Sequence, residues 1–271
     1  DTIDANTTLS GVVKTTSLAR PDAYSATGNT TLTVDAASGL LSNDADPDGS
    51  GALIISAYDA ASAQGGQVAV NTTTGAFTYN PPVGYEGTDS FSYTIRDVDG
   101  NTDTTTVTLT VTEMVWYINN TAGAGGDGRY ATPFNSLAAF STAQTRSAAN
   151  DPEAGDIIFI YQGSGAYTNG ITLKPNQQLI GQGENLVVNG QTIVTAAGDP
   201  IITNTTTANG GDGIVLATGN TVRGLTVGNT NDAGIWGSSV GTATVSNVVI
   251  NGTGKILAIS GGTLAMTFDS L

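Results

Sequence analysis

The chain has 271 residues, of which 39% are hydrophobic and only 11% are charged, and its formal net charge is −15. This length suits about two domains, and the apolar content is sufficient for a buried core. The acidic balance argues against binding DNA or RNA, because phosphates are bound by cationic side chains, and the absence of His and Cys excludes Ser-His-Asp and Cys-His catalysis, His-ligated zinc and disulfides.

Neither a membrane span nor a leader peptide is visible in the sequence. No apolar run approaches the ~20 residues that a helix needs to cross a bilayer. Because no signal peptide is present, we interpret Asp1 as a mature start inside a longer chain. An acidic surface suits solubility outside the cell and attracts cations. We therefore expect an extracellular or cell-surface protein with no membrane span.

Residues 20–112 alternate between short β-rich runs and turn signals. The expected strands are rich in Thr, Val, Tyr and Phe and lie at 30–34, 52–60, 67–70, 76–80, 89–95 and 104–111. Apolar and polar residues alternate in FSYTI and TVTLTV, as in antiparallel sheets with one face in water. We predict an all-β fold that begins with a seven-strand β-sandwich over 20–112, with 1–19 as a leading strand or linker.

Several phrases of this segment carry a family resemblance. In order they are GLLSNDADPDGSG (39–51), GAFTYNPP, GYEGTDSFSY and DVDG, followed by a terminal strand of Thr and Val. Together they resemble the cadherin-like, Ig-like tandem repeats of large bacterial surface adhesins. The resemblance implies a stalk module of a secreted or cell-surface protein, with Ca²⁺ as its cofactor.

The acidic turns are the candidate metal sites. Carboxylates at alternate positions can converge on Ca²⁺, which takes six to eight oxygen ligands. The first candidate is Asp44, Asp46 and Asp48, and the second is Asp97 and Asp99, helped by Asp103 or by Asp22. An EF-hand is excluded, because its twelfth position would be Ile55 rather than Glu. The alternative is a solvated turn in which Asp side chains bond to their own backbone.

The texture changes after a segment expected to be a linker, 113–128. The best helical pattern follows at 132–145, with Thr132 as N-cap and Pro133 at the first helical position. A buried strand is expected next, within 153–167. A short amphipathic helix ahead of such a strand resembles the opening of pectate-lyase-like right-handed parallel β-helices. In that family the helix covers the first coil, as an exposed stack end requires.

The remaining residues repeat with a period of 21–23. The apolar pairs 23 apart are Val222 and Val245, Leu225 and Val248, Val227 and Ile250, and Ile202 and Leu225, and those 21 apart are Ile214, Ile235 and Ile256. Such a period is typical of a solenoid whose coils stack. Segments 177–183, 220–229 and 243–252 would be copies of one strand, with Asn229 and Asn251 stacked at a corner. We predict a parallel β-helix over 129–271.

The chain stops at Leu271 within what reads as a further coil. Because a solenoid usually needs a terminal cap, we expect a larger parent protein or a covering molecule. Unpaired backbone at such an end would also allow association with other copies. The expected partners are therefore other copies or modules of the same surface protein, with glycans or a neighbouring cell surface as further candidates.

The preferred functional interpretation is a non-catalytic structural or adhesive section of a bacterial surface protein. The alternative is a polysaccharide lyase whose catalytic face lies partly beyond the chain end. Such an enzyme needs clustered carboxylates with a cationic base, and the candidate bases are Arg223 and Lys174. The acidic residues of 129–271 are scattered, which favours the first interpretation. Ice binding would require Thr-x-Thr at matching coil positions, and the sequence does not repeat that register.

Overall fold

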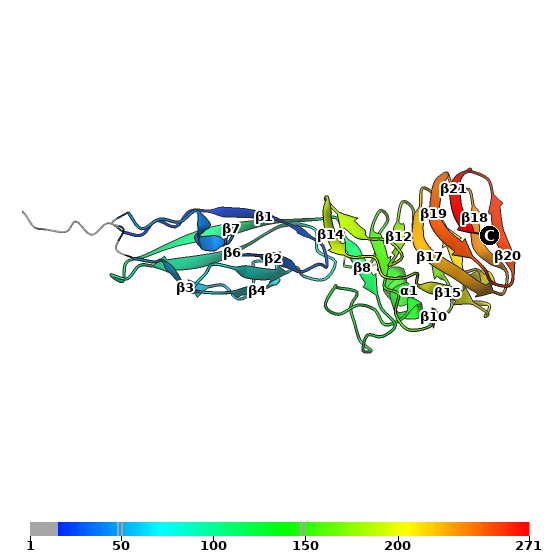
Figure 1. The fold of residues 1–271 in the computed structure, drawn as a ribbon, viewed down its shortest axis with the longest axis horizontal. Coiled ribbons are helices and arrows are strands. Elements are labelled where there is room, and N and C mark those ends of the chain that lie inside the picture. The colour runs from blue at the N-terminus through cyan, green and yellow to red at the C-terminus, as the bar shows by residue number, and fades with distance from the viewer. Residues whose placement is uncertain (1–15, 48, 50, 147, 149, 271) are drawn as a thin grey trace, which may run out of the picture. The chain divides into compact units, whose positions relative to one another are not determined.

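The computed structural model describes residues 16–270, apart from positions 48, 50, 147 and 149 (Figure 1). The chain forms two compact units. The first contains the described residues up to Tyr24 together with Leu32–Tyr79 and Thr88–Thr110, and the second contains Ser25–Thr31, Asn80–Gly87 and the chain from Val111 onward.

Seven strands and one short 3-10 helix make the sandwich. They are β1 (Asp22–Thr27), β2 (Leu32–Val34), η1 (Leu40–Ser42), β3 (Ile54–Tyr58), β4 (Gln67–Val70), β5 (Phe77–Asn80), β6 (Gly87–Arg96) and β7 (Thr102–Thr112). One sheet has the order β1-β7-β6-β3 and the other β2-β5-β4. The pairs β2–β5 and β3–β6 are antiparallel. The runs expected from the sequence all contain a strand, and β1 is the addition.

The sandwich core follows from the alternation of β5 to β7. In β6, Phe91, Tyr93 and Ile95 are buried, and the residues between them are less so. Phe77 of β5 meets the Phe91 ring at 5.6 Å between ring centroids. Inward residues of a strand lie two apart, so each strand lays one apolar row on the core. Strand β1 adds no row of large apolar side chains to the core, because its two buried residues are Asp22 and Ala26.

The second unit is built mainly of parallel strands. They are β8 (Val115–Ile118), β9 (Ile157–Ile160), β10 (Ala166–Tyr167), β11 (Ile171–Thr172), β12 (Gln178–Gly181), β15 (Ile201–Asn204), β16 (Ile214–Leu216), β17 (Thr221–Thr230), β18 (Ala233–Ser238), β19 (Thr242–Ile250), β20 (Lys255–Ser260) and β21 (Thr263–Ser270). One sheet has the order β10-β15-β17-β12-β9-β8, extended by β19 and β21, and another the order β11-β16-β18-β20.

The strand register confirms most of the predicted repeat. Strands β12, β17 and β19 are successive parallel neighbours, and Leu225 lies beside Val248. Two expected pairs are wrong. Ile202 pairs with Val227 rather than Leu225, so the spacing at this step is two residues longer than predicted. Ile235 pairs with Leu257, which leaves Ile256 on the other face of β20 and exposed.

The beginning of the parallel part differs from the sequence prediction. Strand β8 lies inside 113–128, the expected linker, and pairs with β9 over four fully apolar or aromatic positions. The helix α1 spans Leu137–Arg146, later than predicted. Phe134 still continues the β arrangement through a bridge to Ile118, and the Ser136 hydroxyl accepts the Ala139 N–H at the helix start. No helix in the described part of the chain is long and apolar enough to cross a membrane.

The helix packs on the first strands of the parallel part. Leu137 and Phe140 are buried in the same apolar cluster as Trp116. The Gln144 side-chain amide donates to the Thr172 carbonyl of β11 at 2.7 Å. The loop that follows β8 covers the free edge of this strand, because the Tyr117 N–H donates to the Gly128 carbonyl of that loop at 2.9 Å. These contacts satisfy backbone groups that an open edge would expose.

A hairpin, β13 (Leu186–Val188) and β14 (Gln191–Val194), belongs to a second apolar cluster. Leu186 packs there with Tyr117, Phe159 and Ile180 of strands β8, β9 and β12. The outer face of those three strands is therefore covered. The hairpin turns at 189–190, an Asn-Gly pair in which both residues have positive φ, as a two-residue turn favours.

Buried amides hold one corner of the stack. The Asn220 side-chain amide donates to the carbonyls of Lys174 and Gln177 at 2.8 and 3.0 Å. The Gln177 amide in turn donates to the Glu153 carbonyl at 2.7 Å. The side-chain oxygen of Asn229 accepts the Thr253 N–H at 3.0 Å, and the stacking of Asn229 on Asn251 stays a prediction. Each of these hydrogen bonds links one layer of strands to the next.

Candidate cation site

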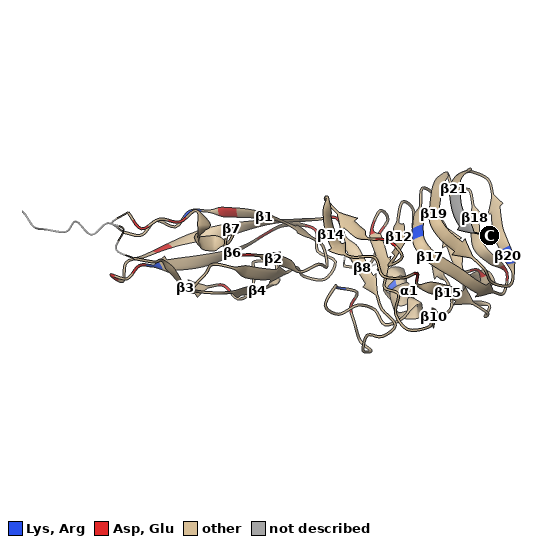
Figure 2. Cartoon of the chain, viewed as in Figure 1, with Lys and Arg blue, Asp and Glu red and all other residues tan. Residues whose placement is uncertain are grey.

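The leading segment of the sandwich, 17–20, is held by three carboxylates. Its serine hydroxyl donates to Asp97 Oδ2 at 2.9 Å. The Ala19 N–H donates to Asp103 Oδ2 at 2.9 Å, and the Arg20 N–H donates to Asp44 Oδ1 at 2.8 Å. These carboxylates come from three different turns or strands. The fold therefore gathers negative charge around this segment, and Figure 2 shows that Asp and Glu outnumber Lys and Arg along the sandwich.

The Tyr93 hydroxyl is surrounded by oxygen atoms. It lies 2.9 Å from Asp22 Oδ2 and 3.1 Å from Asp44 Oδ2. The Leu40 carbonyl lies at 2.9 Å and the Arg20 carbonyl at 3.4 Å. A phenol donates only one proton, so it satisfies one of these acceptors at a time. The arrangement leaves two carboxylates and two carbonyls close to one point.

The charges of this cluster are poorly compensated. Burial, together with the neighbouring Asp44 charge, raises the pKa of Asp22 to about 6, although hydrogen bonds from Tyr93 and Asn43 oppose the change. Burial also raises the pKa of Asp44, although bonds from Arg20 and Tyr93 oppose the change. The pKa of Tyr93 is far above its usual value because of burial and both carboxylates. The phenol therefore stays protonated, and a cation would relieve the carboxylate repulsion.

The first predicted metal set is only partly assembled. Asp44 joins the oxygen cluster, whereas Asp46 lies in the turn beyond it, where its backbone carbonyl accepts the Gly49 N–H. Asp48 lies outside the described residues. Asp22, suggested as a helper of the second set, instead lies beside Asp44. The structure thus brings together Asp22 and Asp44, a pair that the sequence did not predict.

The second predicted set lies in the turn between β6 and β7. The Asp97 carboxylate accepts the Asn101 N–H and side-chain amide, both at 2.8 Å, besides the Ser17 hydroxyl. Burial raises the pKa of Asp97, but these bonds outweigh it and hold the pKa below its usual range. Asp97 therefore closes the turn.

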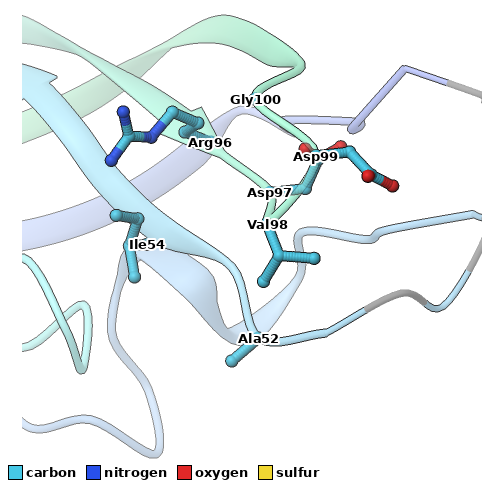
Figure 3. A pocket seen from close by; sticks show the side chains of 7 residues that line it. All are labelled: Ala52, Ile54, Arg96, Asp97, Val98, Asp99 and Gly100. Carbon is cyan, nitrogen blue, oxygen red and sulfur yellow. The ribbon is translucent and has the colours of Figure 1, made fainter.

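A hollow of about 510 Å³ adjoins this turn and is lined by Ala52, Ile54, Arg96, Asp97, Val98, Asp99 and Gly100. Figure 3 shows the Asp99 carboxylate directed away from Arg96. Within the described residues, no three acidic side chains form a metal-binding group. Calcium at Asp97 and Asp99 stays a prediction.

The two candidate catalytic bases are engaged in other bonds. Arg223 forms an ion pair with Glu184 Oε2 at 2.7 Å, and the other Glu184 oxygen accepts the Asn247 amide at 2.9 Å. Lys174 donates from Nζ to the Pro152 carbonyl at 2.6 Å. Each cation is thus part of a bond between layers of the stack. Such bonds suit a structural role of these side chains.

Residues 15–113 match the family of the bacterial cadherin-like domain. The cadherin-like domain therefore begins before 20, the predicted start, and includes the segment that the carboxylates hold. No curated protein and no solved structure gave a significant match to the chain.

Tyr93 is the member of the oxygen cluster that sequence reasoning missed. Its position in the alternation of β6, between Phe91 and Ile95, reads as an ordinary core residue. Only its hydroxyl, at the end of the buried ring, reaches Asp22 and Asp44. A buried Tyr usually finds a polar partner, which was the one signal available. The match of residues 15–113 to the bacterial cadherin-like domain is the finding that supports a surface-protein role.

Proposed function

We propose that this chain is a non-catalytic structural and adhesive section of a bacterial surface protein. In this proposal a calcium-stiffened cadherin-like domain precedes a right-handed parallel β-helix that displays a binding surface. The match of residues 15–113 to the bacterial cadherin-like domain is the observation that carries the proposal. The parallel register of β12, β17 and β19 supports the β-helix, because each layer adds to the last without a new core.

Calcium is proposed at the oxygen cluster around Tyr93. Asp22 and Asp44 would supply carboxylate oxygens, and the Leu40 and Arg20 carbonyls would complete a hard-oxygen set of the kind that Ca²⁺ prefers. A bound ion would offset the repulsion between the two carboxylates. It would also tie 17–20 to the body of the domain, which would stiffen the point where the chain enters.

Calcium should raise the melting temperature of the cadherin-like domain. A ligand at 100 times its dissociation constant adds about 2.7 kcal/mol of stability, which corresponds to a shift of about 13 °C for a domain of about 100 residues. The measurement is scanning calorimetry of the whole chain in millimolar Ca²⁺ and in chelator. Asp44→Asn keeps the acceptor for the Arg20 N–H but removes a charge, and it should abolish most of the shift.

Asp59→Asn is the matched control, because Asp59 is exposed and likewise accepts a backbone N–H. This variant should keep the calcium shift. An unchanged transition of the unmodified chain with and without Ca²⁺ would contradict the calcium proposal. The proposed surface role would then be supported only by the match of residues 15–113 to the bacterial cadherin-like domain.

The chain should not cleave polysaccharides. A lyase base must be free to take a proton, whereas Arg223 is ion-paired and Lys174 is bonded to a carbonyl. The purified chain should show no turnover of polygalacturonate, alginate or other acidic glycans with Ca²⁺ present. Turnover that Arg223→Ala or Lys174→Ala abolishes would refute the non-catalytic role.

A further inference from the structure

One outward face of the parallel part carries an exposed tryptophan. Trp236 lies on β18, in the sheet of order β11-β16-β18-β20, and is 36% exposed. Ile235, which precedes it on the same strand, and Leu216 of the adjacent strand β16 belong to the buried core. Because successive side chains of a strand point to opposite faces, Trp236 projects from the outer face.

The surroundings of Trp236 are apolar and small. In register, Val215 lies on one side of it and Ala258 on the other. Ile256 precedes Ala258 by two residues, so it shares that face, and it is 45% exposed. Ser238 and Ser260, paired across the next position, are exposed and supply hydroxyls. The face is therefore an aromatic platform with aliphatic flanks and a rim of hydroxyl groups.

Charge is almost absent from this platform. Strands β11, β16 and β18 contain no Asp, Glu, Lys or Arg. Lys255, the charged residue of β20, is ion-paired to Asp232 at 2.6 Å. The chain as a whole carries −15. An uncharged apolar patch on so acidic a molecule is a feature of interaction surfaces rather than of ordinary solvated strands.

We propose that this Trp236 platform binds a neutral glycan. A pyranose ring presents an apolar face of C–H groups and an edge of hydroxyls, which matches an aromatic ring beside Ser238 and Ser260. An acidic glycan gains no cation here and is repelled by the net charge. A second copy of the chain would bring a further net charge of −15 close to a chain that already carries −15. The neutral ligand is the one that charge does not oppose.

This inference rests on the proposed adhesive role and names its ligand class. It predicts that Trp236 carries most of the affinity, because buried aromatic side chains dominate small contact areas. The sites of calcium and glycan lie in different units, so each can be removed without touching the other. Trp236 is in the second unit, whereas Asp22 and Asp44 are in the first.

The chain provides its own optical probe. It has two tryptophans, and the other, Trp116, is buried with its indole N–H bonded to Asp156 at 2.8 Å. A ligand on the platform should shift the Trp236 emission to the blue and protect it from acrylamide quenching, while Trp116 stays unchanged. The probes are cellohexaose, maltohexaose, xylohexaose and mannohexaose, with hexagalacturonate as the acidic comparison.

Calorimetric titration of the whole chain then tests the residue. Trp236→Ala should weaken binding of the neutral hexasaccharide about tenfold or more, and Trp236→Phe should weaken it less. Val187→Ala is the matched control, since Val187 is an exposed apolar residue on the β13–β14 hairpin. It should bind as the unmodified chain does. Thermal transitions of all variants verify that they fold.

Four results would overturn the proposal. They are no response to any of the neutral probes, full affinity in Trp236→Ala, equal or tighter binding of hexagalacturonate, and a dimer in sedimentation that Trp236→Ala dissociates. The last would assign the platform to a second copy. If any of them is found while calcium still raises the melting temperature and no glycan is cleaved, glycan binding at Trp236 is rejected and the proposed structural role is retained. Turnover of a glycan would instead refute the proposed function itself.

Discussion

Asp89→Ala is expected to destabilise the cadherin-like domain by about 3–5 kcal/mol. The Asp89 carboxylate is buried and accepts four hydrogen bonds. They come from the Ser62 and Tyr79 hydroxyls at 2.5 and 2.6 Å and from the Gln64 and Ser90 N–H groups at 2.9 and 2.7 Å. Alanine would remove the carboxylate that these four donors share, two of which are the buried Ser62 and Tyr79 hydroxyls, and a buried donor that loses its acceptor costs about 1–3 kcal/mol.

The effect of Asp89 should also depend on pH. Burial raises its pKa, but the four hydrogen bonds outweigh burial and hold the pKa below its usual value. A lowered pKa contributes stability that is complete above the unfolded-state pKa, near 3.9, and is lost as the pH falls through the folded-state value. The difference between the unmodified chain and Asp89→Ala should therefore be constant above about pH 5 and shrink in stronger acid.

Amide hydrogen exchange at Gln64 and Ser90 measures this effect within the domain. Both amides should lose protection in Asp89→Ala at neutral pH. Asp59→Ala is the matched control, because Asp59 accepts one N–H at an exposed position, and its cost should stay near 0.5 kcal/mol. Equal losses in the two variants would show that the buried network adds nothing.

Leu225→Ala is expected to destabilise the second unit by about 3–5 kcal/mol. Leu225 is fully buried and belongs to the same apolar cluster as Trp116, beside Val248 of the next layer. Its removal would leave a cavity between layers that backbone hydrogen bonds hold at a set spacing, so the walls have little freedom to collapse. A large cavity term adds to the lost burial in such sites.

Tryptophan fluorescence during urea unfolding measures this change, because Trp116 and Trp236 both lie in the second unit. The transition midpoint should fall in Leu225→Ala. Thr244→Ala removes an exposed side chain from β19, the adjacent strand, and should change stability by no more than about 0.5 kcal/mol. A midpoint of Leu225→Ala that matches this control would show that the stack relaxes around the lost side chain.

Local periodicity predicted much of the fold because strands express it within a few residues. Alternation in β6 and β7 placed their inward rows, and the 23-residue spacing of Leu225 and Val248 matched two adjacent layers. Where a turn changes length by one residue, the prediction failed. Ile235 meets Leu257 rather than Ile256, and the displaced Ile256 becomes part of the exposed Trp236 platform.

Segments without a clear period were predicted less well. The four residues of β8 are too few to show an alternation, and only pairing with β9 makes them a strand. The helix start moved past Pro133 because Phe134 pairs with Ile118 as part of the β arrangement. Both differences arise where a long-range partner, absent from the local pattern, decides the backbone.

The amino-acid sequence was enough to predict that this chain is acidic, lacks His and Cys, and joins a cadherin-like domain to a layered β structure. Those properties depend on composition and on spacing along the chain. Which carboxylates lie together became visible only in the folded chain. Asp22 at the start of β1 and Asp44 in the loop after η1 meet at the Tyr93 hydroxyl of β6, although they are far from Tyr93 in the sequence. Such a meeting depends on distances through space, which spacing along the chain does not encode.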